Sequence, residues 1–166
     1  MINKPLTEIE ANFERNCFAC SPKNPIGLKL KFLTDGKKLH TRFYPEVLHS
    51  GWGEILHGGI AATLVDETSA WCVIALCKTM CVTQNLNLSF HRPILVKREI
   101  CIMAEIVHRS DKRIHTRAEI YNDDDVLCLS AEGVFVPIDT KKAKRLKIMT
   151  DAEIAEFQSL LSHISV

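Results

Sequence analysis

The sequence predicts an α+β fold in which an antiparallel sheet curls around one long helix. Residues 57–77 are apolar nearly all round, which is typical of a helix that other elements must cover. From residue 81 to residue 138 the side chains instead alternate with period two, which is typical of strands. A run of strands beside a single long helix favours an antiparallel α+β arrangement over alternating strands and helices.

Before the long helix, the chain predicts one short helix and a hairpin. Residues 6–16 have apolar side chains at helical spacing, which indicates a short amphipathic helix. Residues 28–33 alternate and lead to an Asp-Gly turn signal at 35–36, so we expect them to pair with a second strand at 38–44. Residues 46–56 are expected to form a loop.

The long helix is expected to begin at the His-Gly-Gly sequence of residues 57–59 and to end near Cys77. A basic tail begins at Asp139, and the pattern of residues 151–161 predicts a last helix. The strands that follow the long helix are expected at 81–92, 98–109, 112–122 and 126–138.

We expect these elements to form one domain. It comprises an N-terminal helix and loop (1–27), a core (28–138), and a basic tail with a C-terminal helix (139–166). An antiparallel sheet wrapped around one central helix is the hotdog architecture, which is therefore the predicted fold.

Composition narrows the class of protein. Hydrophobic residues make up 46% and charged residues 25%, as in ordinary soluble proteins, and the net charge of +1 gives no field that would recruit nucleic acid or an acidic membrane. Residues 60–77 are long and apolar enough to suggest a membrane span, but each of the two acids near their centre would cost about 3 kcal/mol there. We therefore expect a buried helix, no signal peptide and no membrane or nucleic-acid partner.

Seven cysteines, an odd number, are expected to be reduced thiols of a cytoplasmic protein. Cys17 and Cys20 have the spacing of half a zinc site. No second cysteine pair and no suitably spaced histidine follows nearby, so an ordinary N-terminal loop is the preferred interpretation. We expect no metal and no cofactor.

Gly58 and Gly59 at the start of the long helix are the first candidate site residues. They carry no side chains, so a ligand can approach the backbone closely. The first N–H groups of a helix lack intrahelical partners and lie at its positive end, where one donor can stabilise an oxyanion by about 3 kcal/mol in a transition state. The alternative is that the two glycines only permit tight packing of helix against sheet.

Asp66 and Glu67 stand in the middle of this apolar helix, where a carboxyl group often has a raised pKa suited to acid–base chemistry. Asp66 shares its helix face with small residues, which leaves room for a substrate, whereas Glu67 shares its face with bulky ones. We therefore assign chemistry to Asp66 and a structural pairing to Glu67. The alternative is that both acids make hydrogen bonds in an interface.

The separation of Gly58 and Asp66 along the helix has a consequence for the oligomeric state. Gly58 and Asp66 are eight residues apart, or about 12 Å along one helix, so one substrate carbonyl cannot touch both. If both act on the same substrate, they come from two chains across a two-fold dimer interface.

These residues resemble a known family. His57-Gly58-Gly59 followed by Asp66 is similar to the HGG-x6-D motif of PaaI-like hotdog acyl-CoA thioesterases, in the 4-hydroxybenzoyl-CoA thioesterase superfamily. Three further segments match ones found in the family, and the resemblance covers roughly residues 17–138. They are Thr83-x-x-Leu86-x-x-x-Phe90-x-Arg92-Pro93, His49-x-Gly51-Trp52, and Cys17-Phe18-x-Cys20 with Asn24-Pro25-x-Gly27-Leu28.

The resemblance implies roles for the residues that match. The Gly58 N–H, with Gly59, would polarise a thioester carbonyl, and Asp66 of the other chain would act as general base on water or as nucleophile. Thr83 would hold that water or the carboxylate, and His57 would shape the start of the helix. Strict alternation places Thr83 on the polar face of its strand, so a bulge or the dimer interface must bring it to the site.

Four other residues match less closely. His49 stands where relatives often have a polar group near the carbonyl; the alternative is an ordinary loop histidine. Ser89, His91 and Arg92 match positions that contact coenzyme A in relatives; the alternative is a solvated strand face. The basic tail could likewise steer phosphate groups, although charge runs are more often solvated surface.

The function that this resemblance implies is hydrolysis of acyl-CoA thioesters, by a homodimer or a dimer of dimers. The first alternative is a non-catalytic hotdog protein that binds acyl-CoA or a related effector. The second is a hydratase or dehydratase, which would need a His–Asp pair for proton transfer that the pattern does not clearly supply. A G-x-S-x-G nucleophile motif is absent from the sequence, which excludes the α/β-hydrolase route.

Overall fold

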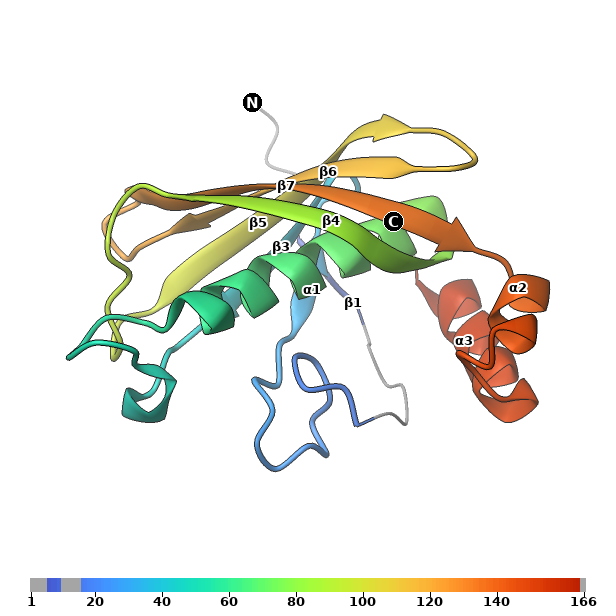
Figure 1. Cartoon of the computed structure of the whole chain (residues 1–166), viewed down its shortest axis with the longest axis horizontal. Coiled ribbons are helices and arrows are strands. Elements are labelled where there is room, and N and C mark those ends of the chain that lie inside the picture. Colours follow the sequence, from blue (N-terminus) through green and yellow to red (C-terminus); the bar gives the residue numbers. More distant parts are fainter. Residues whose placement is uncertain (1–5, 10–15, 165–166) are drawn as a thin grey trace.

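The computed structural model describes residues 6–9 and 16–164. It has a seven-stranded antiparallel sheet with the order β1-β2-β3-β5-β6-β7-β4, and the long helix α1 lies along one face of it (Figure 1). The hotdog architecture predicted from the sequence is confirmed. The strands are β1 (Thr7–Ile9), β2 (Phe32–Thr34), β3 (Lys38–Phe43), β4 (Met80–Phe90), β5 (Ile100–Arg109), β6 (Ile114–Tyr121) and β7 (Leu127–Ile138). The helices are a 3₁₀ turn (Val47–His49), α1 (Gly58–Cys77), α2 (Thr140–Arg145) and α3 (Asp151–His163).

Helix α1 forms the centre of the core. Ten of its 20 residues are buried, among them Leu64, Val65 and Cys72, which are fully covered. By length and composition alone α1 could cross a membrane, yet here it packs against the sheet. The loop before β2 and the C-terminal helix α3 cover the side of α1 that faces away from the sheet (Figure 1). Coverage from both sides accounts for a helix that is apolar nearly all round.

Strand β4 lies at the edge of the sheet and contains a bulge. Thr83 pairs with Phe135 and Asn85 pairs with Val134, so Gln84 is an extra residue with no partner opposite it. The bulge reverses the alternation, and Thr83 therefore points to the same face as Leu86, toward α1. Strict alternation would place Thr83 on the opposite face with the polar residues, and of the two expected ways to bring it to the site, a bulge or the dimer interface, the structure shows the bulge.

Val82 changes face for the same reason. Strict alternation would place Val82 on the same face as Leu86, Leu88 and Phe90, whereas the structure leaves it 40% exposed on the outer face. The four strands after the helix, the hairpin partner at 38–44 and the loop at 46–56 otherwise agree with prediction to within two residues.

The N-terminal segment differs from expectation. Residues 7–9 form strand β1, which pairs with β2, so the helix predicted over 6–16 is wrong there; residues 10–15 of that helix lie outside the described residues. The strand expected over 28–33 is shorter, because Lys29 adopts a left-handed conformation with φ of 56°. Leu28 and Leu30 still bury their side chains in the core.

The C-terminal segment packs against the core. Helix α3 begins at a capping box formed by Thr150 and Glu153, and buries Phe157 and Leu160. Lys78, which ends α1, donates a hydrogen bond at 2.6 Å to the carbonyl oxygen of Ile164. The short helix α2 precedes α3 and was not predicted.

The packing beside the bulge yields a stability prediction for Gly133→Ala. A Cβ at Gly133 would lie 2.6 Å from a ring carbon of Phe135 and 2.6 Å from Oγ1 of Thr116, and both side chains are buried. We expect the free energy of unfolding to fall by about 1–3 kcal/mol, as is typical of overpacking. Urea unfolding followed by circular dichroism measures it.

Gly58→Ala is the matched control, because a Cβ there would meet Phe90 at an ordinary 3.5 Å. Equal stability of the two variants would contradict the packing described around Gly133.

Candidate active site

The N-terminus of α1 presents one backbone donor. His57 is the N-cap residue, and its Nδ1 accepts a hydrogen bond from the N–H of Gly59 at 2.9 Å. Because Nδ1 accepts this bond, Nε2 is the ring nitrogen left to donate. The Gly59 N–H is thereby occupied, whereas the Gly58 N–H has no acceptor within the part of the chain that the structure describes.

A cavity of about 310 Å³ lies near the start of α1, with Leu56 and Ala61 among its lining residues. The ring of Phe90 lies over Gly58, 3.5 Å from the place where a Cβ would stand. A glycine there keeps the backbone open to a ligand in the cavity. The cavity is lined by Ile55, Leu56, Ala61, Phe90, His91, Arg92, Pro93 and Ile94.

Asp66 and Thr83 form the second feature. The hydroxyl of Thr83 donates a hydrogen bond of 2.8 Å to Oδ1 of Asp66, which joins α1 to β4 just before the bulge. Burial raises the pKa of the Asp66 carboxyl, and the bond from Thr83 opposes part of that rise. Asp66 itself is only half-buried and Thr83 is exposed, so a ligand or partner chain can reach the pair.

Glu67 points to the other side of α1. Its Oε1 accepts hydrogen bonds from Nε1 of Trp71 at 3.0 Å and from the thiol of Cys17 at 3.4 Å. Burial raises the pKa of Glu67 to about 7. The sequence predicted a structural pairing for this residue but could not name the partners, because Cys17 is 50 residues away in the chain.

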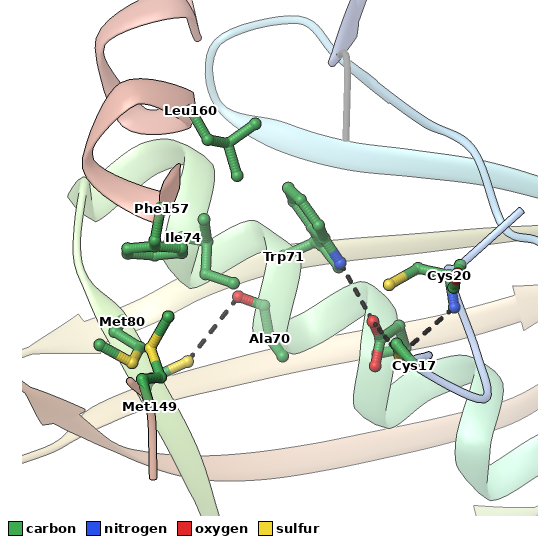
Figure 2. Close-up of a pocket in the computed structure, with 12 residues that line it drawn as sticks. Cys17, Cys20, Ala70, Trp71, Ile74, Met80, Met149, Phe157 and Leu160 are labelled. Atoms are coloured by element: carbon green, nitrogen blue, oxygen red, sulfur yellow. Dashed lines mark hydrogen bonds between the residues drawn. The ribbon is translucent and has the colours of Figure 1, made fainter. Parts of the chain in front are cut away.

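A second cavity, of about 230 Å³, lies beside Glu67 and was not expected from the sequence (Figure 2). A hydrogen bond from the Cys20 thiol lowers the pKa of Cys17, and the same bond raises the pKa of Cys20. The rest of the lining is mostly apolar. It consists of Ser21, Ala70, Trp71, Ile74, Met80, Cys81, Met149, Phe157 and Leu160.

The remaining predicted site residues hold parts of the chain together. Nδ1 of His49 accepts the N–H of Glu46 at 2.8 Å, and the His49 carbonyl accepts the N–H of His57, so His49 fixes the loop to the start of α1. Nε2 of His91 lies 2.8 Å from the hydroxyl of Ser130. Arg92 donates to the Leu127 carbonyl at 3.0 Å.

His91 and Arg92 line the 310 Å³ cavity, whereas Ser89 is exposed and does not line it. Gly58 and Asp66 belong to one continuous helix, so they are about 12 Å apart along its axis. A single chain therefore places Asp66 beside Thr83, and Gly58 beside Phe90 of the cavity lining, but it does not bring Asp66 and Gly58 together.

A long helix held against an antiparallel sheet, with an acid–hydroxyl pair at the sheet edge, defines a protein of the hotdog class. The model of the thioesterase superfamily matches residues 53–129, which include α1 and β4. Acyl-coenzyme A thioesterase THEM4 of Mus musculus is 25% identical over 88 residues, or 52% of this chain and 37% of that protein. This chain thus spans well under half the length of that relative.

Solved structures show the same fold. A crystal structure titled as a thioesterase superfamily protein has a TM-score of 0.67 and 22% identity, covering 74% of this chain and 60% of its own. The Escherichia coli PaaI protein has a TM-score of 0.60 and 17% identity, covering 68% and 81%. A hypothetical thioesterase of Streptococcus pneumoniae solved with coenzyme A has a TM-score of 0.59 and 19% identity. The match covers 61% of this chain and 81% of that protein. The resemblance to hotdog thioesterases that the motifs indicated is confirmed.

The N-cap of α1 yields a prediction for His57→Ala. The change removes the side-chain acceptor of the Gly59 N–H, so the free energy of unfolding should fall by about 1 kcal/mol. His57→Asn keeps an N-cap acceptor and should retain most of the stability. Chemical denaturation of both variants measures the difference, and equal losses in the two would contradict a capping role for His57.

Proposed function

We propose that this chain is an acyl-CoA thioesterase that works as a homodimer with its sites at the subunit interface. The observation that carries the proposal is the Asp66–Thr83 pair, set on the accessible side of α1 at the open edge of the sheet. The superfamily match and the relative described as an acyl-coenzyme A thioesterase support it. The seven unpaired cysteines favour a cytoplasmic location.

The proposed reaction is attack of water on the thioester carbonyl. The Asp66 carboxylate, held by Thr83, takes a proton from water as its oxygen bonds to the carbonyl carbon. The Gly58 N–H donates to the oxygen on which negative charge develops, at the positive end of α1. The carbon–sulfur bond then breaks, and the thiolate of coenzyme A leaves with the proton that Asp66 took from water. His91 and Arg92 lie where the cavity can receive the polar part of the substrate.

The edge strand explains how two chains would complete the site. Strand β4 pairs with β7 on one side only, and an open edge of 11 residues invites pairing with another strand. Along β4, Thr83 adjoins Asp66, and Phe90 adjoins Gly58. Antiparallel pairing of two β4 strands about a two-fold axis near residues 86 and 87 would set Asp66 of one chain opposite Gly58 of the other.

Asp66→Asn tests the chemical role. The change keeps the size of the side chain and removes the charge, so turnover should fall by about 100-fold or more while the protein stays folded. A panel of aliphatic and aryl acyl-CoAs, assayed by release of the coenzyme A thiol, measures the loss. Asp111→Asn, in the turn between β5 and β6, is the matched control and should keep wild-type turnover.

Wild-type turnover in Asp66→Asn would contradict the proposed mechanism. Binding of acyl-CoA by the wild-type protein without any release of thiol would favour the non-catalytic alternative.

Gly58→Ala tests the other half of the site. The added methyl group would stand 3.5 Å from Phe90 and should not disturb folding, since alanine stabilises a helix by up to about 1 kcal/mol relative to glycine. It projects where the carbonyl must approach, so activity should fall while the melting temperature holds or rises. A lower melting temperature with normal turnover per folded chain would remove Gly58 from the site.

Mixing the two variants tests whether the site is shared. After subunit exchange, half of the dimers contain one Asp66→Asn chain and one Gly58→Ala chain, and one of their two sites is then intact. Turnover per chain should recover to about a quarter of the wild-type value. No recovery, with exchange verified by mass spectrometry, would show that each site uses Asp66 and Gly58 of the same chain.

A further inference from the structure

Three side chains of types that bind metal ions lie together on the side of α1 that the proposed thioesterase site does not use. Cys17 and Cys20 come from the loop before β2, and Glu67 comes from the middle of α1. Their sulfur and carboxylate oxygen atoms all lie within 4.8 Å of one another. Figure 2 shows both cysteines beside the end of the Trp71 ring that carries its nitrogen, at one end of the 230 Å³ cavity.

Neither the fold nor thioester hydrolysis explains a carboxyl group in this place. Glu67 is largely buried, and its hydrogen bonds come from the Cys17 thiol and the Trp71 indole. Among residues 6–9 and 16–164, no lysine or arginine pairs with it. A buried carboxyl group is stabilised by hydrogen bonds, by protonation, by a positive charge or by a metal, and the two hydrogen-bond donors here supply no positive charge.

The cysteine pair has the local geometry of a metal-binding turn. The spacing Cys-x-x-Cys is common in zinc sites, and the backbone N–H of Cys20 donates to the sulfur of Cys17 at 3.4 Å. A tetrahedral Zn²⁺ with bonds of about 2.3 Å to sulfur separates two sulfur ligands by about 3.8 Å. The three ligand atoms lie within 4.8 Å of one another, so small side-chain rotations would bring them to the separation that a zinc ion requires.

The surroundings complete such a site. Nε1 of Trp71 donates to Oε1 of Glu67 at 3.0 Å, and a hydrogen bond of this kind orients a ligating carboxylate. Three protein ligands leave one position of a tetrahedral ion open, and the adjoining cavity has room for a water ligand there.

We propose that Cys17, Cys20 and Glu67 bind one Zn²⁺ ion per chain, with a water from the cavity as fourth ligand. The two thiols lose their protons to solvent as the sulfur–zinc bonds form, and no electron transfer is involved. The ion links the N-terminal loop to the centre of α1. This role is independent of the proposed thioesterase activity.

The test is metal reconstitution of the full-length protein. The protein is stripped with a chelator, dialysed with a non-thiol reductant, and titrated with Zn²⁺ and separately with Co²⁺. We expect one Zn²⁺ per chain by elemental analysis, a thiolate-to-cobalt charge-transfer absorption band, and a higher melting temperature with zinc than without it.

Variants separate the ligands from the rest of the chain. Cys17→Ser, Cys20→Ser and Glu67→Gln should each weaken binding by more than about tenfold, and Trp71→Phe should weaken it by about 10–100-fold through loss of the indole donor. Cys101→Ser on β5 is the matched control and should bind zinc as the wild type does. Circular dichroism verifies that each variant is folded.

Three results would overturn the proposal. One is a wild-type protein that binds no stoichiometric zinc after reconstitution. Another is a Cys17→Ser, Cys20→Ser double variant that retains the ion with wild-type affinity. The third is a disulfide between the two cysteines that persists under the reductant and leaves no metal bound. The wild-type measurements decide the proposal even where a variant fails to fold.

Discussion

Helix α1 buries half of its residues against the sheet, and its two adjacent acids must then lie where the core leaves space. Because neighbouring residues of a helix point about 100° apart, Asp66 and Glu67 emerge on different sides. Asp66 lies beside the edge strand, within reach of solvent and of Thr83. Glu67 lies under the N-terminal loop, among sulfur groups and the Trp71 ring. The candidate active site at Asp66 and the cysteine cluster at Glu67 therefore lie on different sides of α1.

The bulge at Gln84 makes the first of these environments possible. Without it, Thr83 would point away from α1 whenever Leu86 and Leu88 pointed toward the core. One extra residue lets the same strand supply a hydroxyl to Asp66 and apolar side chains to the core. The bulge lies in an edge strand. Because β4 pairs with β7 alone, the irregular hydrogen bonding disturbs only one pair of strands. Loss of regular pairing at this point is therefore compatible with a stable sheet.

Much of the fold could be predicted from the sequence, because α1 and the four later strands have long and unambiguous periodic patterns. The errors lie where tertiary contacts outweigh local pattern. Residues 7–9 have helical spacing yet pair with β2, and Lys29 breaks an alternating segment by adopting a positive φ. The contact between Thr83 and Asp66 agrees with what the family resemblance implied, while their chemical roles stay predictions. No local signal could show that Cys17 would lie beside Glu67, since they are 50 positions apart in the chain, with β2, β3 and the first half of α1 between them.

The two environments share one helix but have separate linings. No residue that lines the cavity beside Gly58 also lines the cavity beside Glu67. An ion at Glu67 would therefore leave the cavity beside Phe90 unobstructed, and would act on the adjacent Asp66 through its charge and through the helix backbone. That backbone is hydrogen-bonded and held by the sheet, so its freedom to move is already small. The first effect of a metal there should fall on the loop that carries Cys17 and Cys20, which is held by turn hydrogen bonds rather than by pairing in the sheet.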